Sequence, residues 1–262
     1  MSGSVYPQLL TGAMSQFPIV KQRRPRTVVN AAADGSSIKL ADPAGETVGW
    51  QLHYANLCDT ELAALQQFFT DMEGSLTSFT FLDPAANLLA WSEALTNSVW
   101  ETAPLLTLSG GVADPLGGNN AWQLANSGQA AQNLTQTLNI PASYTYCFSV
   151  YAFSSQPVAM QLQLGSNLAQ FVLNVHWNRI RITGTCGETG AAVEVGLQLP
   201  AGATACVFGP QVEAQPAPSA YQTGTTGGVY ENVRFRDDAF TLTSTDMNHH
   251  SATVNIYYAN SL

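Results

Sequence analysis

The stretch WQLHYANLCDTELAALQQFFTDMEG, residues 50–74, decides the fold of the outer parts of this chain. Its first five residues alternate apolar and polar side chains, which predicts a half-buried strand. Asp59 or Thr60 can then cap a helix whose apolar residues recur at helical spacing up to Met72. Gly74 is the residue type that ends helices. The stretch therefore predicts a strand followed by a helix, the one convincing helix of the sequence.

The residues around this stretch predict strands. Asp34-Gly35 separates the β-like runs Thr27–Val29 and Ser37–Leu40, a spacing typical of a hairpin. Ser78–Leu82 returns to a strand pattern after the helix. Residues 1–85 are therefore expected to form a mainly β body.

The last part of the chain again shows strand-like patterns. Glu231–Arg236 alternates cleanly, and Phe240–Thr243 and Ala252–Tyr258 resemble paired strands. A segment this short cannot build a core of its own. We therefore expect it to complete the sheet begun by residues 1–85, which predicts one discontinuous domain made of residues 1–85 and 224–262.

Residues 86–223 differ from the flanking segments in having few charged residues. They are predicted to be an inserted domain, since insertion at a loop is well tolerated. Residues 86–222 carry six acidic and two basic side chains. Short strand candidates recur along the segment, which is typical of a β-sandwich or jelly roll. The candidates are Ala121–Leu124, Tyr144–Phe153, Ala159–Leu164, Ala169–Val175, Arg179–Thr183, Ala192–Leu199 and Ala205–Val212.

Composition favours a protein of large assemblies. Of the 262 residues, 45% are hydrophobic and 10% are charged, against about 25% charged in ordinary domains. Depletion of charge is typical of interface cores. The net charge of −9 and a single short basic cluster, Lys21–Arg26, speak against specific nucleic-acid binding. The four cysteines form no CxxC pair, so we expect free thiols and no zinc site. No apolar run has the length of a membrane span.

The outer segments resemble the distal-tail and minor-tail ring proteins of long-tailed phages. The resemblance implies a tail-tube-like β-sandwich or barrel body with one helix. It also implies a homo-oligomeric ring, a hexamer, around the tail channel, in contact with tube, hub and fibre proteins. The expected location is the tail tip or baseplate of a virion assembled in the host cytoplasm. We expect the arm Val5–Leu10 to lie against an adjacent subunit. The matching residues are Trp50–Tyr54, Leu57–Glu61, Phe68, Phe69, Gly74, Phe79–Pro84 and Tyr230–Phe235.

A series of residues in the middle segment carries a second resemblance through its order and spacing: Asn87–Leu89, Ser92, Glu93, Trp100, Asp114, Pro115, Gly117, Gly118, Ala121–Leu124, Tyr146–Ala152, Trp177–Arg179, Gly209–Glu213 and Ser219–Tyr221. With these residues the segment resembles a carbohydrate-binding-module-like domain of phage tail and fibre proteins, which implies an antiparallel jelly-roll β-sandwich. Sugar binding is a further implication of this resemblance.

Aromatic side chains are the candidates for a sugar platform, because a flat apolar ring can stack on the C–H face of a sugar. Trp91 and Trp177 have polar neighbours and are expected at the surface, with Tyr144 as a third candidate. Aromatic rings also fill sandwich cores, and this alternative is expected to hold for Trp100 and Trp122.

No catalytic or metal site is predicted. The carboxylates of the middle segment have no hydrolase-like setting, and no GxSxG elbow marks a nucleophilic serine. His249 and His250 are adjacent, so on a strand their side chains point to opposite faces. One carboxylate, Asp114, is thin support for a structural calcium ion, and no cofactor is expected.

The function expected from the sequence is structural: a tail-tip ring that displays the sandwich outward for fibre docking or host glycan contact. The alternative is a receptor-binding protein whose main role is recognition of a host polysaccharide.

Overall fold

The computed structural model describes residues 4–187 and 189–259, and its fold is mainly β with one helix. The chain divides into two compact units. Unit 1 comprises residues 1–10, 14–81 and 230–262, and unit 2 comprises residues 11–13 and 82–229. No described helix is long and apolar enough to span a membrane.

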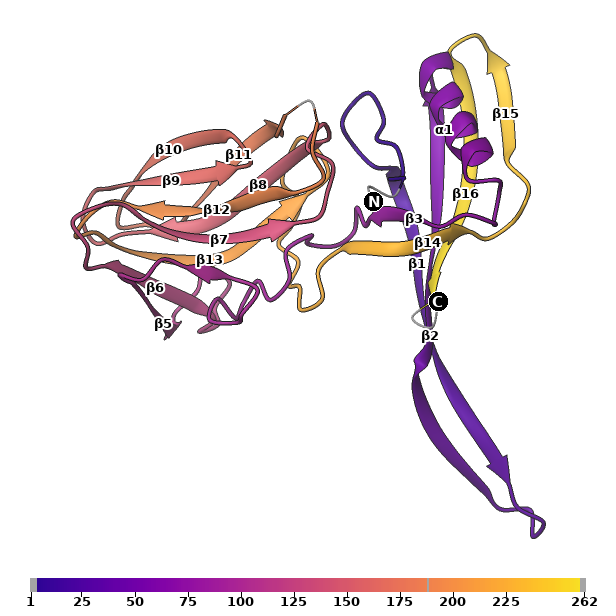
Figure 1. Cartoon of the computed structure of the whole chain (residues 1–262), viewed down its shortest axis with the longest axis horizontal. Coiled ribbons are helices and arrows are strands. Elements are labelled where there is room, and N and C mark those ends of the chain that lie inside the picture. Colours follow the sequence, from indigo (N-terminus) through magenta and orange to yellow (C-terminus); the bar gives the residue numbers. More distant parts are fainter. Residues whose placement is uncertain (1–3, 188, 260–262) are drawn as a thin grey trace. The chain divides into compact units, whose positions relative to one another are not determined.

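Unit 1 is built on one six-stranded sheet (Figure 1), in the order β1-β2-β16-β14-β3, with β15 paired to β16. The strand next to β2 in the sheet, opposite to β1, is β16 from the end of the chain. The two strands pair antiparallel from Thr47↔Ala259 to Leu57↔His250. This confirms that the last strands complete the sheet begun by the first segment. The elements are β1 (Gln16–Ala31), β2 (Ser37–Leu57), α1 (Asp59–Asp71), β3 (Phe79–Leu82), β14 (Val229–Phe235), β15 (Thr241–Asp246) and β16 (His249–Ala259).

The core of unit 1 lies on the face of the sheet that α1 covers. Trp50, Leu52 and Tyr54 are buried, whereas Gln51 and His53 between them are partly exposed. The predicted alternation of a half-buried strand is therefore confirmed. The helix contributes Leu62 and Leu65 as its buried residues, together with Phe68 and Phe69, which pack their rings edge-on against Phe235.

Tyr6 of the N-terminal arm packs into the core of its own unit, so the prediction that the arm lies against an adjacent subunit is wrong for Tyr6 and stays a prediction for the other residues of the arm. Tyr6 is fully buried. Its ring lies 5.6 Å from those of Phe68 and Phe81, and its hydroxyl is 2.9 Å from the hydroxyl of Tyr54. Burying such a large ring among aromatic neighbours stabilises the unit, and the paired hydroxyls satisfy each other.

The helix begins one residue earlier than the capping pattern predicts. Cys58 is the N-cap residue, and its backbone N–H donates to the Glu61 carboxylate at 3.2 Å. Asp59 is the first helical residue and uses its carboxylate for contacts with the β15–β16 turn. Neither Asp59 nor Thr60 is therefore the cap.

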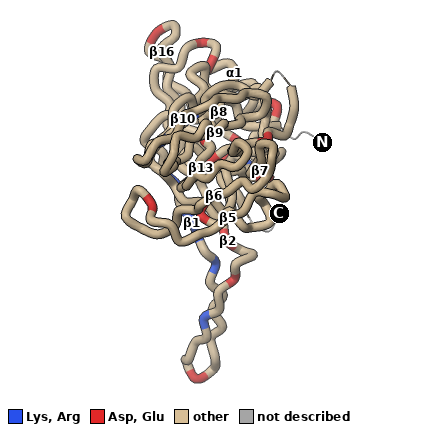
Figure 2. Tube along the Cα trace, turned by 90° about the vertical axis from the view of Figure 1, so that its left-hand side faces the viewer, with Lys and Arg blue, Asp and Glu red and all other residues tan. Residues whose placement is uncertain are grey.

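The tip of the β1–β2 hairpin is a two-stranded ribbon (Figure 1). From Arg26↔Asp42 to Ala31↔Ser37 the two strands pair with each other, while β16 pairs with β2 only over residues 47–57 among the described residues. Gly35, with φ +84°, closes the turn. This confirms the hairpin predicted at Asp34-Gly35. Five of the chain's nine Lys and Arg residues lie on β1 and β2 (Figure 2), and two of these five, Arg26 and Lys39, lie in the ribbon itself.

Unit 2 is an antiparallel sandwich of two five-stranded sheets (Figure 1), which confirms the predicted sandwich architecture. One sheet has the order β10-β9-β12-β7-β4 and the other β11-β8-β13-β6-β5. All seven predicted strands are present, and β4, β5 and β7 are additional. The bounds are β4 (Glu101–Thr102), β5 (Leu106–Val112), β6 (Ala121–Asn126), β7 (Gln132–Leu138), β8 (Thr145–Phe153), β9 (Val158–Leu164), β10 (Asn167–Leu173), β11 (Asn178–Thr185), β12 (Val193–Leu199) and β13 (Thr204–Glu213).

The core of the sandwich alternates along its strands. In β8, Tyr146, Phe148, Val150 and Ala152 are fully buried between the sheets. The alternate residues of β8 point to the other face of the sheet. On that face Cys147 and Ser149 are covered, whereas Tyr151 and Phe153 are partly exposed. All four cysteines of the chain are free thiols, as expected.

Candidate functional site

A row of outward side chains crosses the sheet β11-β8-β13-β6-β5. Phe153 of β8 is paired with Cys206 of β13, Cys206 with Gln123 of β6, and Gln123 with Ser109 of β5. Trp177 immediately precedes β11 and packs against Phe153, with ring centroids 4.5 Å apart. Residues directly opposite in an antiparallel pair point to the same face. The row is about 19 Å long because it crosses five strands, and every member is at least partly exposed.

A second row runs beside the first. Arg179 of β11 is paired with Tyr151 of β8, and Tyr151 is paired with Phe208 of β13. The rings of Tyr151 and Phe208 lie 6.0 Å apart, and Tyr221 packs edge-on against Phe208 at 5.0 Å. The Arg179 guanidinium lies 5.4 Å from the Tyr151 ring centroid, within cation–π range.

We call this surface the aromatic face, defined by Tyr151, Phe153, Trp177, Phe208 and Tyr221. Tyr151 and Phe153 are two residues apart on one strand, so their rings are spaced by about 7 Å. Phe208 is buried and supports the others, which are half-buried and present part of each ring to solvent.

The segment after β13 is fixed across part of the aromatic face. The Glu213 carboxylate accepts the backbone N–H of Ser219 at 3.1 Å to each oxygen, and the Arg179 guanidinium donates to the Ser219 carbonyl and, at 3.0 Å, to the Ser149 hydroxyl. Tyr221, which follows in this segment, bonds to the Ser92 hydroxyl at 3.1 Å and donates to Glu93 at 3.3 Å. These contacts hold the aromatic face in a set geometry before any ligand arrives.

The three aromatic residues predicted to bind sugar do not form one site. Trp177 belongs to the aromatic face. Tyr144 precedes β8 at the end opposite to Phe153, about 30 Å away along the strand, and burial raises its pKa to about 12. Trp91 is 40% exposed on a loop with φ +51°, and among the described residues its ring contacts no ring of the aromatic face.

The prediction that Trp100 fills the sandwich core is confirmed, whereas Trp122 is only half-buried. Trp100 is buried and its indole N–H donates to the Trp91 carbonyl at 3.1 Å. Trp122 is half-buried and donates to the Glu93 carbonyl at 3.0 Å. Each ring therefore packs in the unit and satisfies its single donor.

The Asp114 carboxylate organises a loop. It accepts the backbone N–H groups of Leu116, Gly118 and Asn120 at 2.8, 3.0 and 3.1 Å. Burial raises the pKa of this carboxyl, but the backbone donors outweigh burial and the net pKa is lowered. The carboxylate is thus stabilised as an anion by the chain itself.

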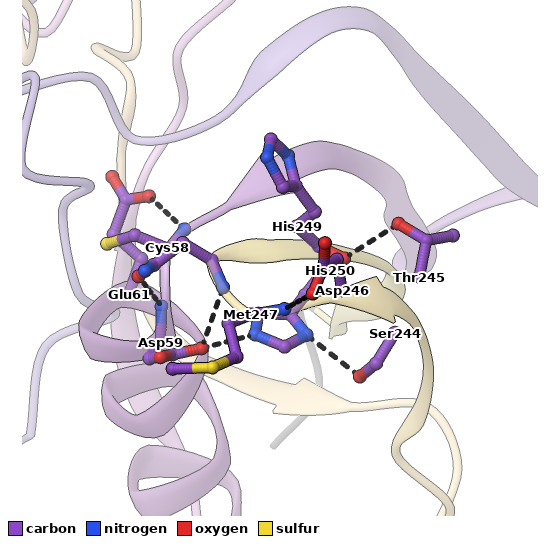
Figure 3. Close-up of polar contacts among 10 residues, drawn as sticks. Cys58, Asp59, Glu61, Ser244, Thr245, Asp246, Met247, His249 and His250 are labelled. Atoms are coloured by element: carbon purple, nitrogen blue, oxygen red, sulfur yellow. Dashed lines mark hydrogen bonds and ion pairs between the residues drawn. The ribbon is translucent and has the colours of Figure 1, made fainter.

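A polar cluster in unit 1 joins the β15–β16 hairpin to the start of α1 (Figure 3). His250 bonds through Nε2 to the Asp59 carboxylate at 2.6 Å and through Nδ1 to the Ser244 hydroxyl at 2.8 Å. The backbone N–H of Asn248 donates to the same carboxylate at 3.1 Å. Figure 3 shows His249 directed away from Asp59, in agreement with the expected opposite orientation of the two histidines.

This cluster contains Ser, His and Asp but has the geometry of a clamp. In a hydrolytic triad the serine lies on Nε2 and the aspartate on Nδ1, and here Ser244 and Asp59 occupy the reverse positions. Within the described residues no group of three or more His, Cys, Asp or Glu side chains could hold a metal ion. The sequence did not reveal the cluster, because Asp59 and His250 are separated by most of the chain.

No protein-family model matches the sequence, and no curated protein matches it. Among solved structures, the enzymatically active domain of tailspike protein 4 of bacteriophage CBA120 matches with 12% identity and a TM-score of 0.40, over 51% of this chain but only 22% of the tailspike chain. The TmCBM61 structure in complex with β-1,4-galactotriose matches with 13% identity and a TM-score of 0.40, over 49% of this chain and 98% of that one.

A CBM22-1 xylan-binding domain from Xyn10C of Paenibacillus barcinonensis matches with 16% identity and a TM-score of 0.40, over 51% of this chain and 98% of the domain. Likenesses at these scores and identities do not establish a shared function.

Proposed function

We propose that unit 2 binds a neutral glycan on the aromatic face, and that the protein recognises a polysaccharide surface without catalysing a reaction on it. The observation that carries this proposal is the half-exposed pair of Trp177 and Phe153 at the head of the cross-strand row. The pair offers apolar ring surface, and the row continues into Gln123 and Ser109, which are exposed hydrogen-bonding groups.

The chemistry of this row matches that of a sugar chain. Rings supply stacking area for the C–H faces of sugars, and a few fixed polar groups orient the ligand. Every member of this row, which is about 19 Å long, is at least partly exposed, so the row suits a chain of several sugar units. Because Arg179 and Glu213 fix the segment that carries Tyr221, little ordering entropy is spent on binding.

The test is a glycan array followed by titration calorimetry with the full chain. Trp177→Ala and Phe153→Ala should each weaken binding of an array hit by at least about tenfold, which corresponds to ~1.4 kcal/mol. Tyr144→Phe, at the far end of β8, is the matched control and should leave affinity unchanged. An array without a neutral-glycan hit, or a hit that Trp177→Ala leaves intact, would refute the proposal.

The second candidate function, assembly into a ring of a phage tail, is favoured by the β1–β2 ribbon. A two-stranded hairpin is marginally stable alone in water, and this one exposes Val29, Ile38 and Leu40 to 54%, 63% and 52%. In this proposal the ribbon is covered by a neighbouring copy, the ring is a hexamer at the tail tip, and tube, hub and fibre proteins are its partners.

The assembly proposal is tested by mass determination and electron microscopy of the full chain. A closed ring that dissociates when residues 28–40 are replaced by a short turn would support it. A protein that stays monomeric at every concentration and never enters tails would exclude it. Glycan binding by unit 2 is measured separately, so either function can fail alone.

A further inference from the structure

A polar groove lies in unit 1 on the face of the sheet opposite α1. It has a volume of about 550 Å³ and is lined by β1, β2, β16 and the residue that follows β14. Gln51 of β2 is paired with Asn255 of β16, and the backbone N–H of Arg236 donates to the Asn255 carbonyl at 2.9 Å. We call it the arginine groove, and it is defined by Gln22, Arg24, Gln51, Arg236, Asn255 and Tyr257.

The arginine groove carries positive charge. Among the described residues that line it, two bear guanidiniums and none bears a carboxylate, in a chain whose net charge is −9. Arg23 and Arg26, which flank Arg24 on β1, form ion pairs with Glu46 and Asp42. Across the described ranges, neither Arg24 nor Arg236 forms an ion pair.

The Arg24 side chain is held over the groove by a neutral partner. Its guanidinium donates to the Gln22 amide oxygen at 2.8 Å. Gln51 donates to the Asn255 side-chain oxygen at 3.2 Å, which leaves the remaining oxygen and N–H groups of these two amides for other partners. The groove therefore combines two cationic groups with amides that both donate and accept.

The two arginines stand at opposite corners of the groove. Arg236 is level with the row of Val20, Gln51 and Asn255, and Arg24 lies four residues further along β1. Three strand spacings across and four residues along place their Cα atoms about 20 Å apart. One small anion cannot bridge such a span, so the geometry fits an elongated ligand with acidic groups at intervals.

We propose that the arginine groove binds a carboxylate-bearing polysaccharide. Guanidinium groups bind carboxylates in a bidentate manner, and the amides and the Tyr257 phenol between them suit hydroxyl groups. A bound peptide would use exposed apolar anchor pockets, whereas the lining has one aliphatic side chain, Val20, and its Trp50 is buried. A nucleic acid would use a longer series of phosphate contacts than two arginines provide. This inference concerns a different unit from the aromatic face and does not depend on it.

The full chain is tested by titration with polygalacturonate and hyaluronan, with dextran as the neutral polymer and poly-glutamate as the acidic peptide. We expect the wild-type protein to bind both acidic polysaccharides. The Arg24→Gln/Arg236→Gln double variant should bind them at least about tenfold more weakly. Lys39→Gln, which removes one exposed charge from the ribbon of the same unit, is the control and should retain full affinity.

Trp177→Ala should leave acidic-polysaccharide binding intact, which separates this site from the aromatic face. If the double glutamine variant does not fold, the Arg24→Lys/Arg236→Lys variant replaces it, because it keeps the charge but loses the bidentate geometry. Its affinity should lie between that of the wild type and those of the single variants Arg24→Gln and Arg236→Gln. Absence of binding, equal binding of poly-glutamate, or binding that neither variant changes would overturn the proposal.

Discussion

Replacement of Tyr6 tests whether the N-terminal arm belongs to the core of unit 1. Tyr6→Phe removes only the hydroxyl, which is 2.9 Å from that of Tyr54. Tyr54 keeps its bond to the Met14 carbonyl at 3.1 Å, so the loss should be that of one buried hydrogen bond, about 1 kcal/mol. Tyr6→Ala also removes a fully buried ring and should cost about 3–5 kcal/mol.

The assay must report on unit 1, because four of the five tryptophans lie in unit 2. Hydrogen exchange of the amides of β2 and β3, followed along a urea series, gives the unfolding free energy of this unit. Leu10→Ala, at a position 73% exposed in the same arm, is the control and should change it little. A cost below about 1 kcal/mol for Tyr6→Ala would show that the arm does not pack as described.

Three further predictions concern single side chains. The pKa of the Asp59 carboxyl is lowered, first by the hydrogen bond from His250, so its stabilising contribution is present above the unfolded pKa of about 4 and is lost as pH falls through the folded-state pKa. Asp59→Asn should therefore flatten the acid dependence of urea unfolding, and an unchanged profile would contradict the clamp. Gly196→Ala places a Cβ 2.4 Å from a backbone carbonyl oxygen of β7 and should cost about 1–3 kcal/mol. Gly184→Ala meets its nearest atom at 3.6 Å and should cost clearly less in the same thermal unfolding experiment. Asn126→Ala removes an amide nitrogen that lies 2.9, 3.0 and 2.9 Å from three backbone carbonyl oxygens, which share its two N–H groups. A loss of about 2 kcal/mol is therefore expected in urea unfolding, and a loss below ~1 kcal/mol would contradict this role.

The strands with strong apolar character could be predicted from the sequence, and those with polar or glycine-rich sequences could not. The run Trp50–Tyr54 alternates, and the structure buries one side of it. β7 has the sequence QNLTQTL and was missed, although it lies inside its sheet between β12 and β4. In β5, the adjacent Gly110 and Gly111 have a sequence typical of a turn, but they occupy an irregularity in the β5–β6 register, so a glycine pair can mark a bulge within a strand.

The candidate site was predictable only in part, because it is made by register and not by a local pattern. Polar neighbours identified Trp177 as a surface residue, but they also selected Trp91, which lies on a separate loop. The partner of Trp177 is Phe153, in a strand whose residues 146–153 are almost all apolar. In such a run the sequence does not distinguish inward from outward side chains, and only the pairing with β11 and β13 does so. The arginine groove likewise depends on strand pairing, which places Arg24 and Arg236 on the same face of the sheet.

Because β3 and β14 are neighbours in the first sheet, the sandwich between them in the sequence is an insertion that could be removed or replaced. The chain leaves the first sheet at the end of β3 and re-enters it at β14, the adjacent strand, and the backbone N–H of Asp83 donates to the Gly228 carbonyl at 2.8 Å where the two crossings meet. Adjacent strands are about 5 Å apart, a gap that a tight turn can close. A shortened chain could thus keep the first sheet intact, and the same sheet could hold any inserted domain whose two ends lie side by side.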